Sequence, residues 1–272
     1  MVRRDNRGSD LFFENELESD AERKLTSVSA CGKPCELQKA FTATWYSGGR
    51  SHLSCAVEGE ELPLSAHDHC FIKGAAPDHT PLLMLHGSSG TELDMVPLAG
   101  RLAPGSMAVA LRGAVPWEAG FAFFRRFEDR SIDERDLLAR ADVLAGEVVR
   151  IGKNYRFPRP PVAIGFSNGA IMAAALLMLY PRCLSGAVLF RPLSPFAVAP
   201  DTRLSRVPAL LVDGDNDERR LRGDGARLAQ RLAHMGADVA HHVLPTGHSI
   251  TEDDIGLTRE WLKPLLGQAE SG

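Results

Sequence analysis

Apolar segments of two kinds alternate along the chain after about residue 69. Short runs such as PLLML (81–85), VAIGF (162–166) and ALLV (209–212) are apolar at every position. Longer segments between them repeat apolar residues with the period of an α-helix, about 3.6 residues. Strands that alternate with helices form a parallel sheet, and strands that are apolar on both faces are covered by helices on both sides. The pattern therefore predicts an α/β fold with a doubly wound, mostly parallel sheet.

The same pattern sets the expected bounds of the elements. We predict strands at 70–73, 82–86, 107–112, 162–166, 186–190, 209–212 and 239–244. We predict helices at 92–102, 133–155, 168–180, 219–235 and 251–266. In such sheets the functional groups gather beyond the carboxyl ends of the strands, so a site is expected in the loops that directly follow these runs.

Residues 1–65 show a different pattern, in which charged residues, Ser and Gly are mixed with isolated aromatics and no period is sustained. We interpret 1–65 as an N-terminal extension and 66–268 as the α/β domain. Within the extension, weak patterns suggest a helix near 11–25 and a strand near 41–46.

Composition and charge exclude some classes of protein. The chain has 272 residues, 44% of them hydrophobic, which is enough to bury a sizeable core. Its net charge of -4 and the lack of any large Lys/Arg cluster give no reason to expect nucleic acid as a partner. The longest apolar stretch, 170–180, is far shorter than the roughly 20 residues of a membrane-spanning helix. No export signal is evident at the N-terminus, so we expect a cytoplasmic protein without a membrane span.

The five cysteines, at positions 31, 35, 55, 70 and 183, are odd in number and scattered, which favours reduced thiols. The pair in CGKPC has no matching second pair elsewhere in the chain. A zinc or redox site there is therefore the less favoured interpretation.

The segment GFSNGA (165–170) places Ser167 between a predicted strand and a predicted helix. A match to the G-x-S-x-G motif alone is weak, and a turn serine without chemistry is the alternative. The strand-turn-helix setting is that of a nucleophile elbow, in which Gly165 and Gly169 permit close approach of the chain. This context favours Ser167 as a nucleophile.

A serine hydroxyl needs a base within hydrogen-bond reach and an acid that orients that base. The predicted strand 209–212 is followed by three acids, Asp213, Asp215 and Asp217, and the last strand is followed by His248. The order Ser, Asp, His is that of an α/β-hydrolase, but spacing alone leaves the three acids in competition.

The loop that contains His248 has a second signal. Ser249 and Glu252 have the spacing of a capping box, which predicts that the last helix begins directly after the histidine. A surface histidine is the alternative. His241 and His242 lie within the preceding strand pattern, and we interpret them as structural.

Attack on a carbonyl also requires donors for the oxyanion. The glycine-rich segment LMLHGSSGTELD follows the strand at 82–86. The backbone N–H groups of Ser88 and Asn168 are the candidate pair, and Asn168 is favoured by its place at a helix N-terminus. A turn capped by Thr91 is compatible with this role.

Five blocks of the chain, in this order, resemble the phospholipase/carboxylesterase family of α/β-hydrolases: LLMLHGSSGTELDMVPLAGRLAPG, LRGAV, FFRRFEDRSIDERDLLAR, GFSNGA and GHSIT. The likeness runs from about residue 81 to residue 266 and is greatest to the bacterial carboxylesterases and hydroquinone-linked hydrolases of that family. It implies an α/β-hydrolase fold with Ser167 as nucleophile, Asp217 as acid and His248 as base. It also places the oxyanion donors at Ser88 and Asn168, and it implies no metal or organic cofactor.

The loop at 114–124 is rich in aromatic residues, and we expect Trp117 and Phe121 to form part of an apolar substrate pocket. Trp117 stands where the resembled family commonly has a glutamate. Arg125 and Arg126 could bind an acidic group of the substrate, but ion pairs with Asp129, Asp133 or Glu134 are the favoured interpretation.

The sequence thus predicts a serine carboxylesterase that acts on a small-molecule ester through an acyl-enzyme. An acyl thioesterase or a lysophospholipase is the alternative within the class. A non-catalytic ligand-binding protein on the same fold is the alternative from another class. Whether the chain forms a homodimer is left open.

Overall fold

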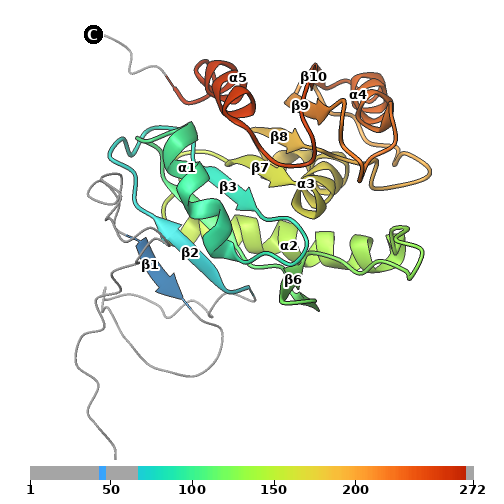
Figure 1. Ribbon diagram of the computed structural model, residues 1–272. Coiled ribbons are helices and arrows are strands. Elements are labelled where there is room, and N and C mark those ends of the chain that lie inside the picture. Colours follow the sequence, from blue (N-terminus) through green and yellow to red (C-terminus); the bar gives the residue numbers. More distant parts are fainter. Residues whose placement is uncertain (1–42, 47–66, 268–272) are drawn as a thin grey trace, which may run out of the picture. The chain divides into compact units, whose positions relative to one another are not determined.

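The short apolar runs form the strands of one large sheet in the computed structural model, which describes residues 43–46 and 67–267 (Figure 1). Within these residues the sheet has eight strands in the order β1-β2-β4-β3-β7-β8-β9-β10. Their bounds are β1 Ala43–Tyr46, β2 His69–Ile72, β3 Leu82–Leu85, β4 Ala108–Leu111, β7 Val162–Phe166, β8 Gly186–Phe190, β9 Pro208–Gly214 and β10 Asp238–Leu244. β2 is antiparallel to both β1 and β4, and the remaining pairs are parallel. The mostly parallel sheet predicted from the sequence is confirmed.

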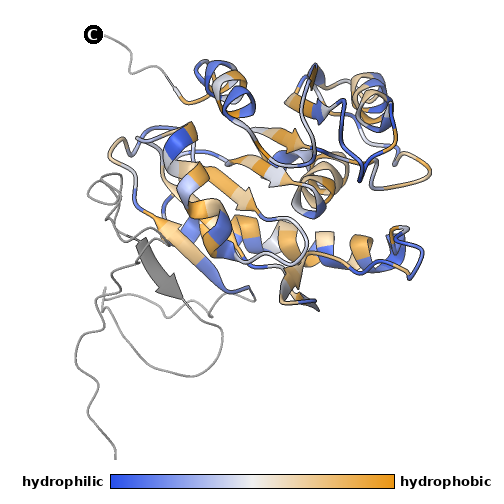
Figure 2. Ribbon diagram, in the orientation of Figure 1, coloured by the Kyte–Doolittle hydropathy of each residue, from blue (hydrophilic) through white to orange (hydrophobic). Residues whose placement is uncertain are grey.

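Helices cover both faces of the sheet, as the all-apolar strands require (Figure 1). Their bounds are α1 Val96–Leu102, α2 Glu134–Asn154, α3 Asn168–Leu179, α4 Asp224–His234 and α5 Glu252–Leu262, with short 3₁₀ turns at Glu92–Met95 and Pro181–Cys183. α1 and α5 pack on one face, and α2, α3 and α4 pack on the other. Figure 2 shows strands in the middle of the sheet coloured mainly as hydrophobic, between helices of mixed colour. The doubly wound architecture is therefore observed.

α3 is buried on every side, and all of its residues from Asn168 to Met178 are at most 1% exposed. It has no polar face because the sheet lies on one side of it and α2 on the other. The alanines of its first two turns let it approach the sheet closely. Since this helix begins directly after Ser167, its burial fixes the position of the serine.

Some elements differ from the prediction. β5 (Val115–Trp117) and β6 (Gly120–Ala122) form a hairpin that the sequence pattern did not predict, because three-residue strands are too short to show a period. α4 begins at Asp224 and not at residue 219, since the Asp224 carboxylate accepts the N–H of Leu221 and closes a turn. α5 ends at Leu262 and not at residue 266.

Two sequence predictions concern the region before residue 66. The strand expected near 41–46 is β1, which pairs with β2, so the large sheet includes a strand from before the expected boundary at 65. The helix expected near 11–25 lies outside the described residues, as do Cys31, Cys35 and Cys55. Cys70 and Cys183 are described, and both are free and buried.

None of the helices in the two described ranges combines the length and the apolar character that crossing a membrane demands.

Candidate active site

Ser167 occupies a strained turn between β7 and α3. Its backbone has φ 52° and ψ -105°, a conformation that L-residues rarely adopt and that functional sites often contain. A side chain on Gly165 would lie 2.5 Å from Gly169 O, and one on Gly169 would lie 2.2 Å from Leu85 O. Both glycines are therefore required by close backbone contacts, as the sequence analysis expected.

Ser167, His248 and Asp217 form a hydrogen-bonded series. His248 Nε2 lies 3.0 Å from Ser167 Oγ, and His248 Nδ1 lies 2.8 Å from Asp217 Oδ2. Because a carboxylate only accepts, Nδ1 carries the proton and the lone pair of Nε2 faces the serine hydroxyl. Burial lowers the pKa of His248 from its ordinary value, and the hydrogen bond to Asp217 opposes this effect. The imidazole is thus a neutral acceptor near neutral pH.

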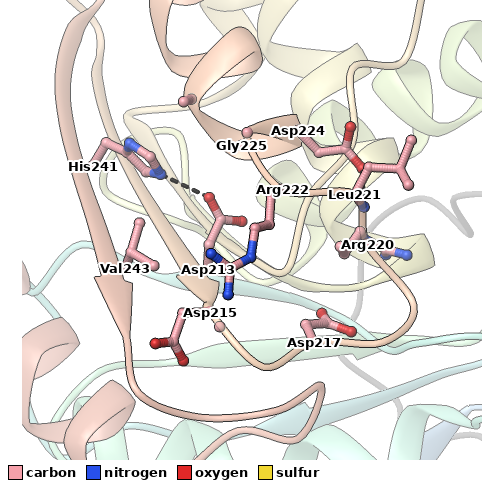
Figure 3. A pocket seen from close by; sticks show the side chains of 13 residues that line it. Asp213, Asp215, Asp217, Arg220, Leu221, Arg222, Asp224, Gly225, His241 and Val243 are labelled. Atoms are coloured by element: carbon pink, nitrogen blue, oxygen red, sulfur yellow. Dashed lines mark hydrogen bonds and ion pairs between the residues drawn. The ribbon is translucent and has the colours of Figure 1, made fainter.

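The three acids that competed in the sequence have different partners. Asp213 lies at the end of β9 and contacts His241, with 2.7 Å between Oδ2 and Nε2. Asp215 is exposed. Asp217 lies farther along the same loop, and its side chain is 1% exposed. Figure 3 shows Asp213 joined to His241 and Asp217 at a separate position of the loop. Among the three, Asp217 contacts His248.

Arg191 holds the loop that contains His248. Its guanidinium donates to Gly247 O at 3.0 Å and to Ser249 O at 2.8 Å, the carbonyls on either side of the histidine. It also binds both carboxylate oxygens of Asp254, at 2.7 and 2.8 Å. Both side chains of this ion pair are fully buried.

The capping box predicted for α5 is wrong in register. The N-cap is Thr251, whose N–H and hydroxyl each donate to Asp254 Oδ2 at 2.7 Å. Thr251 and Asp254 thus form the capping box in place of Ser249 and Glu252. The helix therefore begins at Glu252, four residues after His248.

Of the two expected oxyanion donors, Ser88 lies in the loop after β3 and Asn168 lies at the start of α3. The backbone N–H groups of Ser88 and Asn168 donate to no other residue in the described part of the chain. His86 positions this loop, since its Nε2 accepts the N–H of Gly113 at 2.9 Å and its Nδ1 donates to Gly87 O at 2.6 Å. Burial lowers the pKa of His86, which is consistent with this neutral tautomer.

The hairpin β5–β6 packs against the loop after β3 that contains Ser88, here called the oxyanion loop. Phe121 N–H donates to Gly90 O at 2.9 Å, and Ser89 Oγ donates to the Glu118 carboxylate. Phe121 is half-buried beneath the Arg112 guanidinium, with 4.9 Å from that carbon to the ring centroid. Trp117 is also half-buried. Neither aromatic residue lines the two cavities described next, and the pocket role expected of them stays a prediction.

Two cavities lie beside the hydrogen-bonded series of Ser167, His248 and Asp217. The larger, of about 480 Å³, extends from the oxyanion loop and is bounded by Ser88 and Ser249. Its apolar lining consists of Met95, Pro97, Leu98, Phe166, Ile250 and Ile255. The smaller, of about 230 Å³, lies behind the acid loop between β9, β10 and the start of α4 (Figure 3). Within the described residues, no group of His, Cys, Asp or Glu side chains is arranged to hold a metal ion.

The surroundings of three arginines, Arg220, Arg125 and Arg126, differ from the sequence analysis. Arg220 was not considered, yet its Nη2 donates to Ser167 Oγ at 3.0 Å. Arg125 forms an ion pair with Asp136, at 3.1 Å, and not with the acids that the sequence suggested. The ion pair expected for Arg126 is wrong, since this side chain contacts no acid in the described ranges.

The sequence analysis also missed Arg191, Asp254 and His86. A single signal could have found Arg191, which directly follows five apolar residues at the end of a predicted strand. A charge at such a position lies at the edge of the sheet where sites gather.

The chain is similar to known hydrolases and carboxylesterases. MhqD of Bacillus subtilis (strain 168), whose name describes a hydrolase, is 30% identical over 199 residues, which are 73% of this chain and 98% of MhqD. The crystal structure of the Bacillus cereus carboxylesterase matches with a TM-score of 0.71 at 33% identity, over 74% of this chain and 95% of that chain. The carboxylesterase of Mesorhizobium loti matches with a TM-score of 0.68 at 30% identity, over 74% and 96% of the two chains. No protein-family model matches. These likenesses confirm the α/β-hydrolase fold.

Proposed function

Because this chain belongs to the phospholipase/carboxylesterase family of α/β-hydrolases and is a carboxylesterase, we propose that it cleaves esters through an acyl-enzyme formed on Ser167. The observation that supports this proposal is the hydrogen-bonded series from Ser167 Oγ through His248 to Asp217, with distances of 3.0 and 2.8 Å. A serine with a base in reach, and a base with an acid behind it, is what nucleophilic acyl transfer requires.

In the first half of the proposed reaction, Ser167 Oγ attacks the ester carbonyl carbon while its proton moves to His248 Nε2. The carbonyl electron pair moves onto oxygen, and the N–H groups of Ser88 and Asn168 donate to the resulting oxyanion. As the carbonyl re-forms, the bond to the alcohol oxygen breaks, and His248 Nε2 returns the proton to that oxygen. The alcohol leaves, and the acyl group stays on Ser167.

In the second half, His248 takes a proton from water, and the hydroxide oxygen attacks the acyl carbon. The tetrahedral intermediate collapses, Ser167 Oγ leaves and regains a proton from His248, and the carboxylic acid is released. Asp217 accepts from Nδ1–H throughout, which holds the productive tautomer and stabilises the imidazolium each time it forms.

We assign the apolar cavity of about 480 Å³ to the hydrocarbon part of the substrate. It is bounded by Ser88, a proposed oxyanion donor, and by Ser249, which follows the proposed base in the chain, so a group bound there stays close to Ser167. Cavities of this size accommodate small ligands and bind them mainly through apolar contacts.

Labelling with a fluorophosphonate, followed by mass spectrometry of the modified peptide, tests the proposal. We expect the label on Ser167 and none on the Ser167→Ala variant. A chain-length series of p-nitrophenyl esters measured beside acyl thioesters then identifies the preferred acyl group and linkage. Labelling of another residue in the folded protein, or hydrolysis that survives in Ser167→Ala, contradicts the assignment.

A further inference from the structure

Arg220 places a positive charge directly beside the proposed nucleophile. Its Nη2 donates to Ser167 Oγ at 3.0 Å, and its Nε donates to Arg191 O at 2.8 Å. Its Nη1 donates to Arg219 O at 3.0 Å. A guanidinium has five N–H groups, so one on each terminal nitrogen remains for a ligand. Two of its three bonds go to backbone carbonyls, which hold the group in place without neutralising it.

Arg126 is a second cation close to this position. It follows Phe124 by two residues, and its guanidinium carbon lies 5.8 Å from the centroid of that ring. Its Nε is buried and has no hydrogen-bond partner among the described residues. The same segment contacts the nucleophile turn, because Phe123 N–H donates to Asn168 Oδ1 at 2.7 Å. Arg126 is near enough to Arg220 that its charge disfavours the charge of Arg220.

Neither arginine has an ion-pair partner within the ranges that the structure describes, whereas Arg112, Arg125 and Arg191 each have one. Burial and the charge of Arg126 lower the pKa of Arg220 to about 10, so the guanidinium is still charged at neutral pH. Partly buried cations that repel one another are costly unless an anion neutralises them. Asp217, Asp224 and Asp213 favour the charge of Arg220 from a distance. None of them forms an ion pair with it in the described ranges, so its free N–H groups remain available to an anion beside Ser167.

We propose that Arg220, with Arg126, forms an anion subsite at Ser167 and that the preferred substrates are esters with a carboxylate close to the scissile bond. This inference rests on the proposed function, because it names the substrate class of the same site. A carboxylate binds a guanidinium at about 2.8 Å, and the carbonyl carbon lies about 3 Å from the attacking oxygen. Arg220 Nη2 lies 3.0 Å from Ser167 Oγ. The carboxylate carbon and the ester carbonyl carbon of the substrate are therefore separated by only a few bonds. Monoesters of short dicarboxylic acids have this spacing.

The decisive measurement is the ratio of kcat/KM for monoethyl succinate to that for ethyl levulinate. The two esters have nearly the same shape, and only the first has a carboxylate. We expect the wild-type protein to prefer monoethyl succinate by about tenfold or more, which is typical of a charge-assisted contact. Arg220→Gln should abolish the preference, and a rise in ionic strength should weaken it in the wild-type protein.

Arg222→Gln is the matched control, because Arg222 is an exposed arginine two residues along the same loop. It removes the same charge and should leave the ratio as it is in the wild-type protein. Equal rates for the two esters in the wild-type protein would overturn the subsite. An equal fall in kcat/KM for both esters in Arg220→Gln would also overturn it, because that result is the signature of a structural role.

A binding experiment keeps this inference separate from the esterase mechanism. In the Ser167→Ala background, calorimetry should detect binding of monoethyl succinate that the added Arg220→Gln change removes. If fluorophosphonate labels Ser167 and ethyl levulinate is hydrolysed but monoethyl succinate is not preferred, the subsite alone is wrong. If no ester is hydrolysed and nothing is labelled, the mechanism is wrong, and the binding arm still decides on the subsite. If monoethyl succinate does not bind to Ser167→Ala, the anion subsite is overturned.

Discussion

Arg191 and Asp254 form a fully buried ion pair in which both carboxylate oxygens are bound, at 2.7 and 2.8 Å. Arg191 follows β8, and Asp254 lies in the first turn of α5. The same guanidinium binds the carbonyls of Gly247 and Ser249. One side chain thus joins the end of the sheet, the start of the last helix and both neighbours of His248.

Asp254→Asn should therefore lower both stability and turnover. Breaking a buried pair by removing one charge typically costs about 3–5 kcal/mol, because the other charge stays buried without compensation. We also expect a fall in kcat, since the loop of His248 loses its support. Denaturant unfolding and steady-state kinetics measure the two effects. The double variant Arg191→Met/Asp254→Leu should recover part of the stability but not kcat; full recovery of both would show that the pair does not position His248.

Asp217→Asn tests the assignment of the acid. An Asn in place of the true acid keeps the shape but favours the wrong imidazole tautomer, which lowers kcat by about 10⁴ in the serine protease precedent. We expect a loss of several orders of magnitude with near-normal thermal stability. Asp215 is exposed, so in Asp215→Asn kcat should fall by at most about tenfold. The reverse ranking would move the acid to Asp215.

The pH dependence of kcat/KM should report His248 of the free enzyme. The base must be neutral to accept the serine proton, so activity falls as pH falls through its pKa. Burial lowers this pKa from its ordinary 6.5, and the charge of Arg220 lowers it further. The midpoint of the acid limb of the pH profile should therefore lie below pH 6.5. In Arg220→Gln the acid limb of the kcat/KM profile should move to higher pH. A limb that stays in place or moves to lower pH would contradict the effect of the Arg220 charge on the pKa of His248.

Gly169→Ala should damage the nucleophile turn. The added Cβ would lie 2.2 Å from Leu85 O, and backbone must move to relieve the clash. We expect a loss of stability together with slow fluorophosphonate labelling of Ser167. Gly256→Ala is the control, because nothing lies within 4 Å of its added Cβ in α5. An alanine in a helix interior should stabilise the protein there, by about 0.5–1 kcal/mol. Equal melting temperatures for the two variants would contradict this account.

Leu98→Trp should narrow the apolar cavity that begins at the oxyanion loop. Esters with long or bulky acyl groups should lose at least about tenfold in kcat/KM, while acetate esters change little, since each buried methylene contributes about 0.8 kcal/mol. Trp117→Ala is the comparison, because the sequence analysis placed Trp117 in the substrate pocket. If Trp117→Ala changes the chain-length profile and Leu98→Trp does not, the pocket lies at the hairpin and not in this cavity.

Local patterns in the sequence determined the strands, most helices and the class of chemistry. An all-apolar run of five residues has few alternatives to a buried strand, and Gly-x-Ser-x-Gly between such a run and an Ala-rich segment has one common physical use. The positions of Ser167 and His248 at the ends of strands followed from these patterns. The choice of Asp217 over its neighbours needed the family resemblance, because the strand and loop spacing did not separate the three acids.

Tertiary structure alone decided which distant charges meet. Arg191 and Asp254 are 63 residues apart, and Arg220 is 53 residues from Ser167, so no periodicity relates them. The three-residue strands of the hairpin and the register of the α5 cap were also missed, because a local signal is ambiguous until a long-range contact selects one option. In the cap, that contact is Arg191, which binds Ser249 O and Asp254 and leaves Thr251 to begin the helix. The sequence thus determined the elements and the candidate nucleophile, whereas the electrostatic surroundings of Ser167 arise only when the parallel sheet brings the ends of β7, β8, β9 and β10 together.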